Sequence, residues 1–156
     1  MTIDEVLGEV YDLFQGFYGQ PLSDYLWGFS CDTNNFTGPN LYNTIGLITI
    51  AISFATAVIY YYVHKPVRWQ RLWWLVYWIG IGVINLLFGF LYVLKHYNNN
   101  LIGDCLVYAQ DGQTQQISEF TCFQFGLANF VFTFLLFFAF SMILKWGSTT
   151  GKYYPF

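Results

Sequence analysis

Charged residues are scarce in this sequence. Asp, Glu, Lys and Arg make up 10% of its 156 residues, whereas an ordinary soluble domain carries about 25%. So few charges cannot cover the surface of a soluble domain, and the 56% apolar content excludes a disordered chain. Lys and Arg number six against nine Asp and Glu, and the resulting net charge of −3 argues against nucleic acid as a partner. The composition therefore predicts a membrane protein.

Residues that carry out chemistry are also scarce. The sequence has two histidines, and it contains no HExxH, CxxC, Walker A, GxGxxG or GxSxG pattern. Its long apolar runs hold no Asp, Glu, Lys or Arg, which are the groups that proton relays and voltage sensors place inside the membrane. We therefore expect no enzyme, and the sequence points to no catalytic residue, no cofactor and no metal ligand.

Three apolar runs stand out, at residues 41–63, 72–94 and 122–144. Each has 23 residues, so a helix of that length measures about 35 Å and can cross a hydrocarbon core of about 30 Å. They must be helical, because backbone groups in lipid need partners within their own segment. The predicted fold is all-α transmembrane, with a three-helix membrane domain over residues 41–144.

The basic residues indicate how the chain is oriented. Lys65, Arg68 and Arg71 lie in the short connection after the first run, and the tail over residues 145–156 holds two more lysines. All nine acids fall on the opposite side of the predicted spans. Because cytoplasmic loops are enriched in Lys and Arg, we expect an external N-terminus and a cytoplasmic C-terminus in a bacterial inner membrane. The basic loop is expected to contact anionic lipid.

An amphipathic helix is predicted over residues 2–19 of the external segment 1–40, ending at Pro21. Its apolar side chains recur at steps of four and three and form one stripe, the docking stripe. This stripe has three interpretations: packing on the chain's own outer loop, contact with another subunit, or binding to the membrane surface. The docking stripe comprises Ile3, Leu7, Val10, Phe14 and Phe17.

The outer loop over residues 95–121 contains Asp111-Gly112 between two strand-like runs. Asp-Gly between such runs is typical of a tight β-turn. We therefore expect a small outer β-hairpin here, and an isolated hairpin needs a surface to pack on.

All three cysteines lie outside the membrane or at its outer boundary in this topology. In an oxidising compartment one disulfide is expected, and three pairings are open. The pairing of Cys31 with Cys105 is favoured because it ties the N-terminal segment to the outer loop, which leaves Cys122 free.

Neutral polar residues fall near the middle of the spans. Thr49, Asn85 and Asn129 lie at similar depths, which predicts one polar layer where Asn85 and Asn129 meet. The layer acts either as structural glue between helices or as the lining of a wetted pore. Ser53 and the small residues Gly82 and Gly89 are spaced for close helix packing.

Two functions remain compatible with these features. The first is a non-enzymatic integral membrane subunit or anchor of a larger complex, docking through its outer helix and loop. The alternative is a self-assembling homo-oligomeric pore, for example a membrane-permeabilising effector. Expected partners are membrane lipids and other copies or other membrane subunits. No resemblance to a known family emerges from the sequence.

Overall fold

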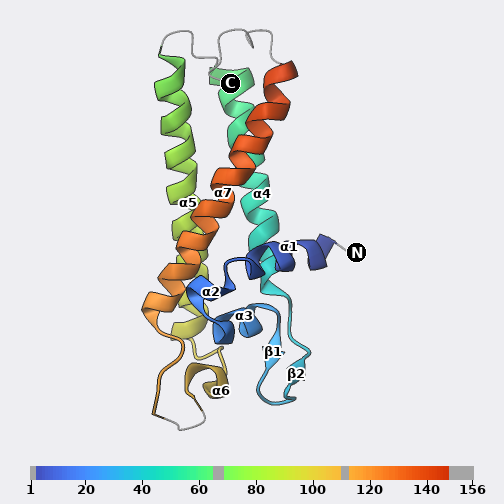
Figure 1. Cartoon of the computed structure of the whole chain (residues 1–156), viewed down its shortest axis with the longest axis vertical. Helices are drawn as coiled ribbons and strands as arrows, with labels where there is room; N and C mark the ends of the chain where they lie inside the picture. The colour runs from blue at the N-terminus through green and yellow to red at the C-terminus, as the bar shows by residue number, and fades with distance from the viewer. Residues whose placement is uncertain (1–2, 65–68, 110–112, 148–156) are drawn as a thin grey trace.

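Three long helices dominate the computed structural model, which describes residues 3–64, 69–109 and 113–147 (Figure 1). They are α4 (Leu41–Val58), extended by the π-helix η1 (Ile59–His64), α5 (Gln70–Asn98) and α7 (Glu119–Gly147). The segments long and apolar enough to cross a membrane are Leu41–His64, Arg71–Asn98 and Glu119–Trp146. The three predicted spans are therefore confirmed as candidate membrane helices, and the second and third extend past their predicted ends.

Helix α7 is the central helix of this bundle, because α4 and α5 both pack against it. Its phenylalanines divide between two environments. Phe125 and Phe137 are fully buried, whereas Phe138 is exposed on the outside of the bundle. The crowded aromatic sequence of α7 thus supplies both the core and part of the apolar outer surface.

Glycines allow the close contact between α5 and α7. Gly82 and Gly89 on α5 face Phe130 and Asn129 of α7, where an added Cβ atom would be crowded. Within this contact, the closest backbone approach is at Gly126, whose Cβ position lies 2.9 Å from the Leu86 carbonyl oxygen. Because a backbone atom cannot move aside as a flexible side chain can, this position requires glycine.

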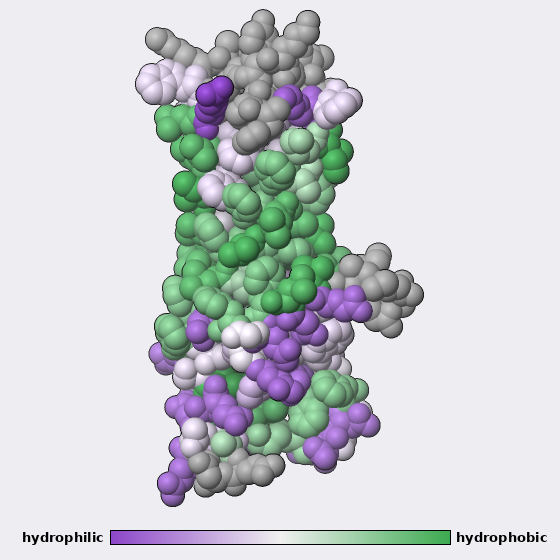
Figure 2. Space-filling model, viewed as in Figure 1, coloured by the Kyte–Doolittle hydropathy of each residue, from purple (hydrophilic) through white to green (hydrophobic). Residues whose placement is uncertain are grey.

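Short elements form a lobe at one end of the bundle, made of residues 3–40, 99–109 and 113–118 (Figure 1). Helix α1 lies across the direction of the long helices and packs on α4, and α2 packs on α7. Figure 2 shows hydrophobic side chains around the long helices, with hydrophilic residues at both ends. The elements of the lobe are α1 (Ile3–Asp12), α2 (Gln15–Tyr18), α3 (Gln20–Leu26), β1 (Phe29–Ser30), β2 (Asn35–Phe36) and α6 (Asp104–Val107).

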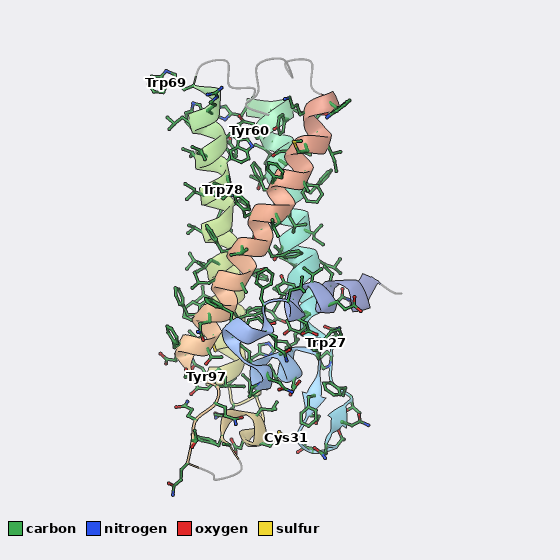
Figure 3. All side chains as sticks on the ribbon, in the orientation of Figure 1. Trp27, Cys31, Tyr60, Trp69, Trp78 and Tyr97 are labelled. Carbon is green, nitrogen blue, oxygen red and sulfur yellow. A yellow bond between two sulfur atoms is a disulfide. The ribbon has the colours of Figure 1, made fainter. Side chains whose placement is uncertain are left out.

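Aromatic residues mark both ends of the long helices. Trp27 and Tyr97 lie at the end that carries the lobe, and Tyr60 and Trp69 lie at the other end (Figure 3). Amphipathic aromatic rings favour the two interfaces of a membrane. Their positions agree with helices that cross a bilayer from end to end.

The single helix predicted over residues 2–19 is wrong. The chain turns at Leu13 and Phe14, between the end of α1 and the start of α2. The reason is tertiary: α1 packs on α4 whereas α2 packs on α7, so the chain must change direction between them. The hydrophobic spacing continues through the turn, and periodicity alone therefore does not reveal the break.

Pro21 begins a helix and does not end one, which corrects a second expectation. It lies in the first turn of α3, where proline is tolerated because backbone N–H groups there lack helical partners. The residue that separates α2 from α3 is Gly19, with φ at +91°. Only glycine adopts this backbone conformation without a steric cost.

The chain has the expected small two-stranded sheet, but at a different place. Strands β1 and β2 pair antiparallel within the N-terminal segment, with Phe29 opposite Phe36. Their rings lie 5.4 Å apart, a cross-strand contact of the kind that stabilises short hairpins.

In the outer loop, the expected strand is replaced by the short helix α6. A single antiparallel bridge joins Tyr108 to Gln115, and the Ala109 N–H donates to the Thr114 carbonyl oxygen at 2.8 Å. The Asp111-Gly112 turn lies outside the described residues. Cys105 is bonded to Cys31, and α6 packs on α3 of the N-terminal segment. The local sequence pattern, which predicts a strand here, contains no information on these tertiary contacts.

Candidate functional site

A centre of buried hydrogen bonds lies where the three long helices meet. Asn129 on α7 accepts at Oδ1 from the Tyr11 hydroxyl at 2.6 Å and from Thr49 Oγ1 at 3.2 Å. Its Nδ2 donates to the Asn85 carbonyl oxygen at 2.8 Å. Asn129 thereby connects α7 to α1, α4 and α5 at one point. All four residues are fully buried, so water does not compete for these hydrogen bonds.

The polar residues predicted to share a layer are brought together, with one difference. Asn85 and Asn129 meet through the Asn85 backbone carbonyl and not through the Asn85 side-chain amide. Within the described ranges, neither amide atom of Asn85 has a hydrogen-bond partner, and neither does the Ser53 hydroxyl. Burying an unpaired polar group costs about 1–3 kcal/mol, so these two side chains do not stabilise the bundle as Asn129 does.

Replacing Asn85 with leucine should therefore leave the protein as stable as before, or stabilise it by up to about 2 kcal/mol. Leucine has a similar shape, removes the unpaired amide and leaves the backbone carbonyl that Asn129 uses. Reversible unfolding in mixed micelles measures the difference. A clear loss of stability would contradict this prediction and would mean that the Asn85 amide has a partner in the assembled protein.

Tyr11 is the functional residue that sequence reasoning missed. It lies on α1 but reaches the bundle core, where its ring stacks on Tyr42 at 5.2 Å and meets Phe132 edge-on at 5.1 Å. Burial raises the pKa of the Tyr11 hydroxyl above its usual range, so the group stays a neutral donor. Its spacing of four from Leu7 was the available signal, because it places Tyr11 on the apolar face of the helix.

A second set of hydrogen bonds fixes the lobe to the bundle. The hydroxyls of Tyr18 and Tyr42 lie 2.6 Å apart, and Tyr42 donates to Ser23 Oγ at 3.0 Å. Ser23 in turn donates to Asp12 at 3.0 Å, and the Trp27 indole N–H donates to both Asp12 oxygens. These contacts join α1, α2, α3 and α4 into one unit.

The docking stripe is largely used inside the protein. Leu7 is buried against Gly46 of α4, and Val10 and Phe14 are partly buried against the same core. Phe17 is half exposed, and the Ile3 side chain lies outside what the structure describes. The described middle of the stripe therefore packs on the chain's own long helices, whereas the intramolecular interpretation had placed it on the outer loop.

One disulfide joins the two parts of the lobe. Cys31, which follows β1, is bonded to Cys105 in α6, as the sequence favoured (Figure 3). Cys122 is free and fully buried in α7. The covalent link holds the N-terminal segment against the loop between α5 and α7.

The basic residues lie at the opposite end of the bundle from the lobe. Arg71 is exposed in the first turn of α5. Lys65, Arg68 and the tail beyond residue 147 fall outside the described residues.

Metal-binding chemistry is not found in the part of the chain that the structure describes, which holds no group of three or more His, Cys, Asp or Glu side chains suited to a metal ion. His64 packs on Trp73 near the start of α5, whereas His96 lies near the end of that helix. The chain matches no protein-family model, no curated protein and no solved structure. Its function must therefore be argued from its own geometry.

Proposed function

We propose that this chain is a non-enzymatic integral membrane subunit or anchor of a larger complex, docking through its lobe. The observation that carries the proposal is the construction of the lobe, which is cross-linked by Cys31–Cys105 and hydrogen-bonded to the bundle. It exposes the large apolar side chains of Phe36 and Leu101, each 58% accessible, outside the candidate spans. Aromatic side chains such as Phe36 are enriched at protein interfaces, and Leu101 adds exposed apolar area to the same lobe.

The proposed orientation places the lobe outside a bacterial inner membrane. The connection and tail at the opposite end carry five of the six Lys and Arg residues, and the acids are concentrated on the lobe side. This asymmetry follows the positive-inside rule, which supports an external N-terminus and a cytoplasmic C-terminus. An external lobe is also consistent with its disulfide, because oxidising compartments maintain such bonds.

The homo-oligomeric pore is supported less well. A ring of subunits needs a polar helix face on the outside of each protomer, where it can line the shared channel. Thr49, Ser53 and Asn129 are instead buried inside one chain. The membrane-facing side chains of α4 and α5 include Leu47, Phe54 and Val83, which are apolar and exposed.

The proposal is tested by purifying the tagged protein from its native host in gentle detergent and determining stoichiometry by native mass spectrometry. Wild type should carry a fixed set of other chains. Replacing both Phe36 and Leu101 with aspartate should weaken that association by about ten-fold or more, the effect of losing an interface anchor.

Asn98→Asp together with Asn99→Asp is the matched control, because it also adds two negative charges, at exposed positions near the lobe, without removing an apolar side chain. Association that survives the replacement of Phe36 and Leu101 would exclude these two residues as anchors. A closed ring of this chain alone would instead favour the pore.

A further inference from the structure

An apolar groove lies between residues 13–17 and helix α7. Its walls are Leu13, Phe14 and Phe17 on one side and Leu127, Phe130 and Val131 on the other. Its volume is about 560 Å³, and pockets of about 300–1,000 Å³ are typical of sites for small molecules. Leu13 is 81% exposed and Phe17 is 51% exposed, so the groove is open to its surroundings.

The groove lies within the apolar stretch of α7. Glu119 and Lys145 bound this stretch and lie 26 residues apart, which is about 39 Å along the helix. A hydrocarbon core of about 30 Å therefore fits between them with about 5 Å to spare at each end. Leu127 is about 12 Å from Glu119 and Val131 about 18 Å, so the α7 wall lies inside the hydrocarbon region, in the half nearer the lobe.

The lining of the groove is suited to a lipid tail. None of its side chains carries a charge, a hydroxyl or an amide, so a polar ligand would lose its contacts with water and find no partner in them. An acyl chain is the apolar molecule that a bilayer supplies at this depth. In the groove such a chain contacts protein on two sides, whereas on the exposed face of α5 it contacts a single helix surface. Because dispersion contacts add up, the groove should hold a chain more firmly than that face does.

We propose that the groove binds one acyl chain of a phospholipid from the leaflet on the lobe side. The chain lies between α7 and the side chains of Leu13 and Phe17, and it covers apolar surface that is otherwise exposed. Since the lining offers no charged or hydrogen-bonding side chain, the groove selects an acyl chain and not a headgroup. This inference is independent of the proposed complex.

Photo-crosslinking locates the bound lipid. The full-length protein is placed in nanodiscs that contain phosphatidylcholine with a diazirine in its acyl chain, transferred to gentle detergent to remove loosely held lipid, and then irradiated. Wild type should retain one phospholipid by native mass spectrometry, with crosslinks concentrated on residues 13–17 and 127–131. Few should form on residues 84–91 of α5, where Ile84, Leu87 and Leu91 are exposed. Phosphatidylglycerol with the same acyl chain should give the same result.

Two substitutions test the groove itself. Gly16 lines it and has open space around its Cβ position, so Gly16→Phe fills the groove without a clash and should lower retention by about ten-fold or more, because the added ring takes the volume of the chain. Gly80→Phe, at an equally open position on α5, should leave retention unchanged. Leu13→Gln places an amide against the chain without removing internal packing, and it should lower retention several-fold. The same change at Leu87, which is exposed on α5, should have little effect.

Three results would overturn the proposal. The first is crosslinking spread evenly over the groove and the exposed face of α5, which is the pattern of lipid without a fixed position. The second is retention that Gly16→Phe and Leu13→Gln both leave unchanged, or that depends strongly on the headgroup. The third is a second copy or another polypeptide that Gly16→Phe displaces from the wild-type protein.

Discussion

Replacing Asn129 with leucine is expected to lower the free energy of unfolding by about 2–4 kcal/mol, because three buried hydrogen bonds are lost together. An interhelical bond in membrane proteins contributes about 0.6 kcal/mol on average and up to about 1.7 kcal/mol. The larger part of the loss comes from the Tyr11 hydroxyl and the Asn85 carbonyl oxygen, which remain buried without the partners they have in the wild type.

Reversible unfolding in mixed micelles measures this effect, with Asn98→Leu as the control. Asn98 is exposed at the end of α5, so the same chemical change there should shift stability by less than about 0.5 kcal/mol. Tyr11→Phe should reproduce part of the Asn129→Leu effect, and the two substitutions together should cost less than their sum, because they remove one shared bond. Additive effects would show that Tyr11 and Asn129 do not interact.

Replacing both Cys31 and Cys105 with serine is expected to destabilise the lobe by about 2–3 kcal/mol. The bond closes a loop with a sequence separation of 74, for which the chain-entropy relation gives about 4 kcal/mol in a free chain. The loss should be smaller here, because α4 and α5 lie within that loop and remain held in the membrane when the lobe unfolds.

Hydrogen exchange resolved along the chain tests this expectation. Protection should fall in α3, β1, β2 and α6 and stay unchanged in the long helices. Cys122→Ser is the control, because this thiol is buried in α7 and takes no part in the disulfide. Loss of protection throughout the long helices would contradict the prediction that the bond stabilises the lobe alone.

The fold could be predicted where one local property decides it. Three charge-free runs of 23 residues predict three candidate membrane helices, because lipid accepts only backbone that is satisfied within its own segment. The sequence also predicts one polar layer where Asn85 and Asn129 meet, because a polar side chain in hydrocarbon needs a partner. Thr49, Asn85 and Asn129 are indeed buried.

The candidate site could be predicted only in part. Asn129 was identified from its depth, but its partners were not, since Tyr11 belongs to a segment far away in the sequence. Asn85 was expected to act through its side chain, whereas its backbone carbonyl makes the bond. Gly126 was overlooked because the requirement for glycine comes from the Leu86 carbonyl on another helix.

The sequence by itself determined the number of candidate spans, because length and apolarity are properties of each segment taken alone. It favoured Cys31–Cys105 among three open pairings, and the structure shows that pair bonded. Only the tertiary structure decided where the helix predicted over residues 2–19 breaks and where the small sheet forms. The physical reason is that each of these depends on which surfaces pack together: α1 turns into α2 because one packs on α4 and the other on α7.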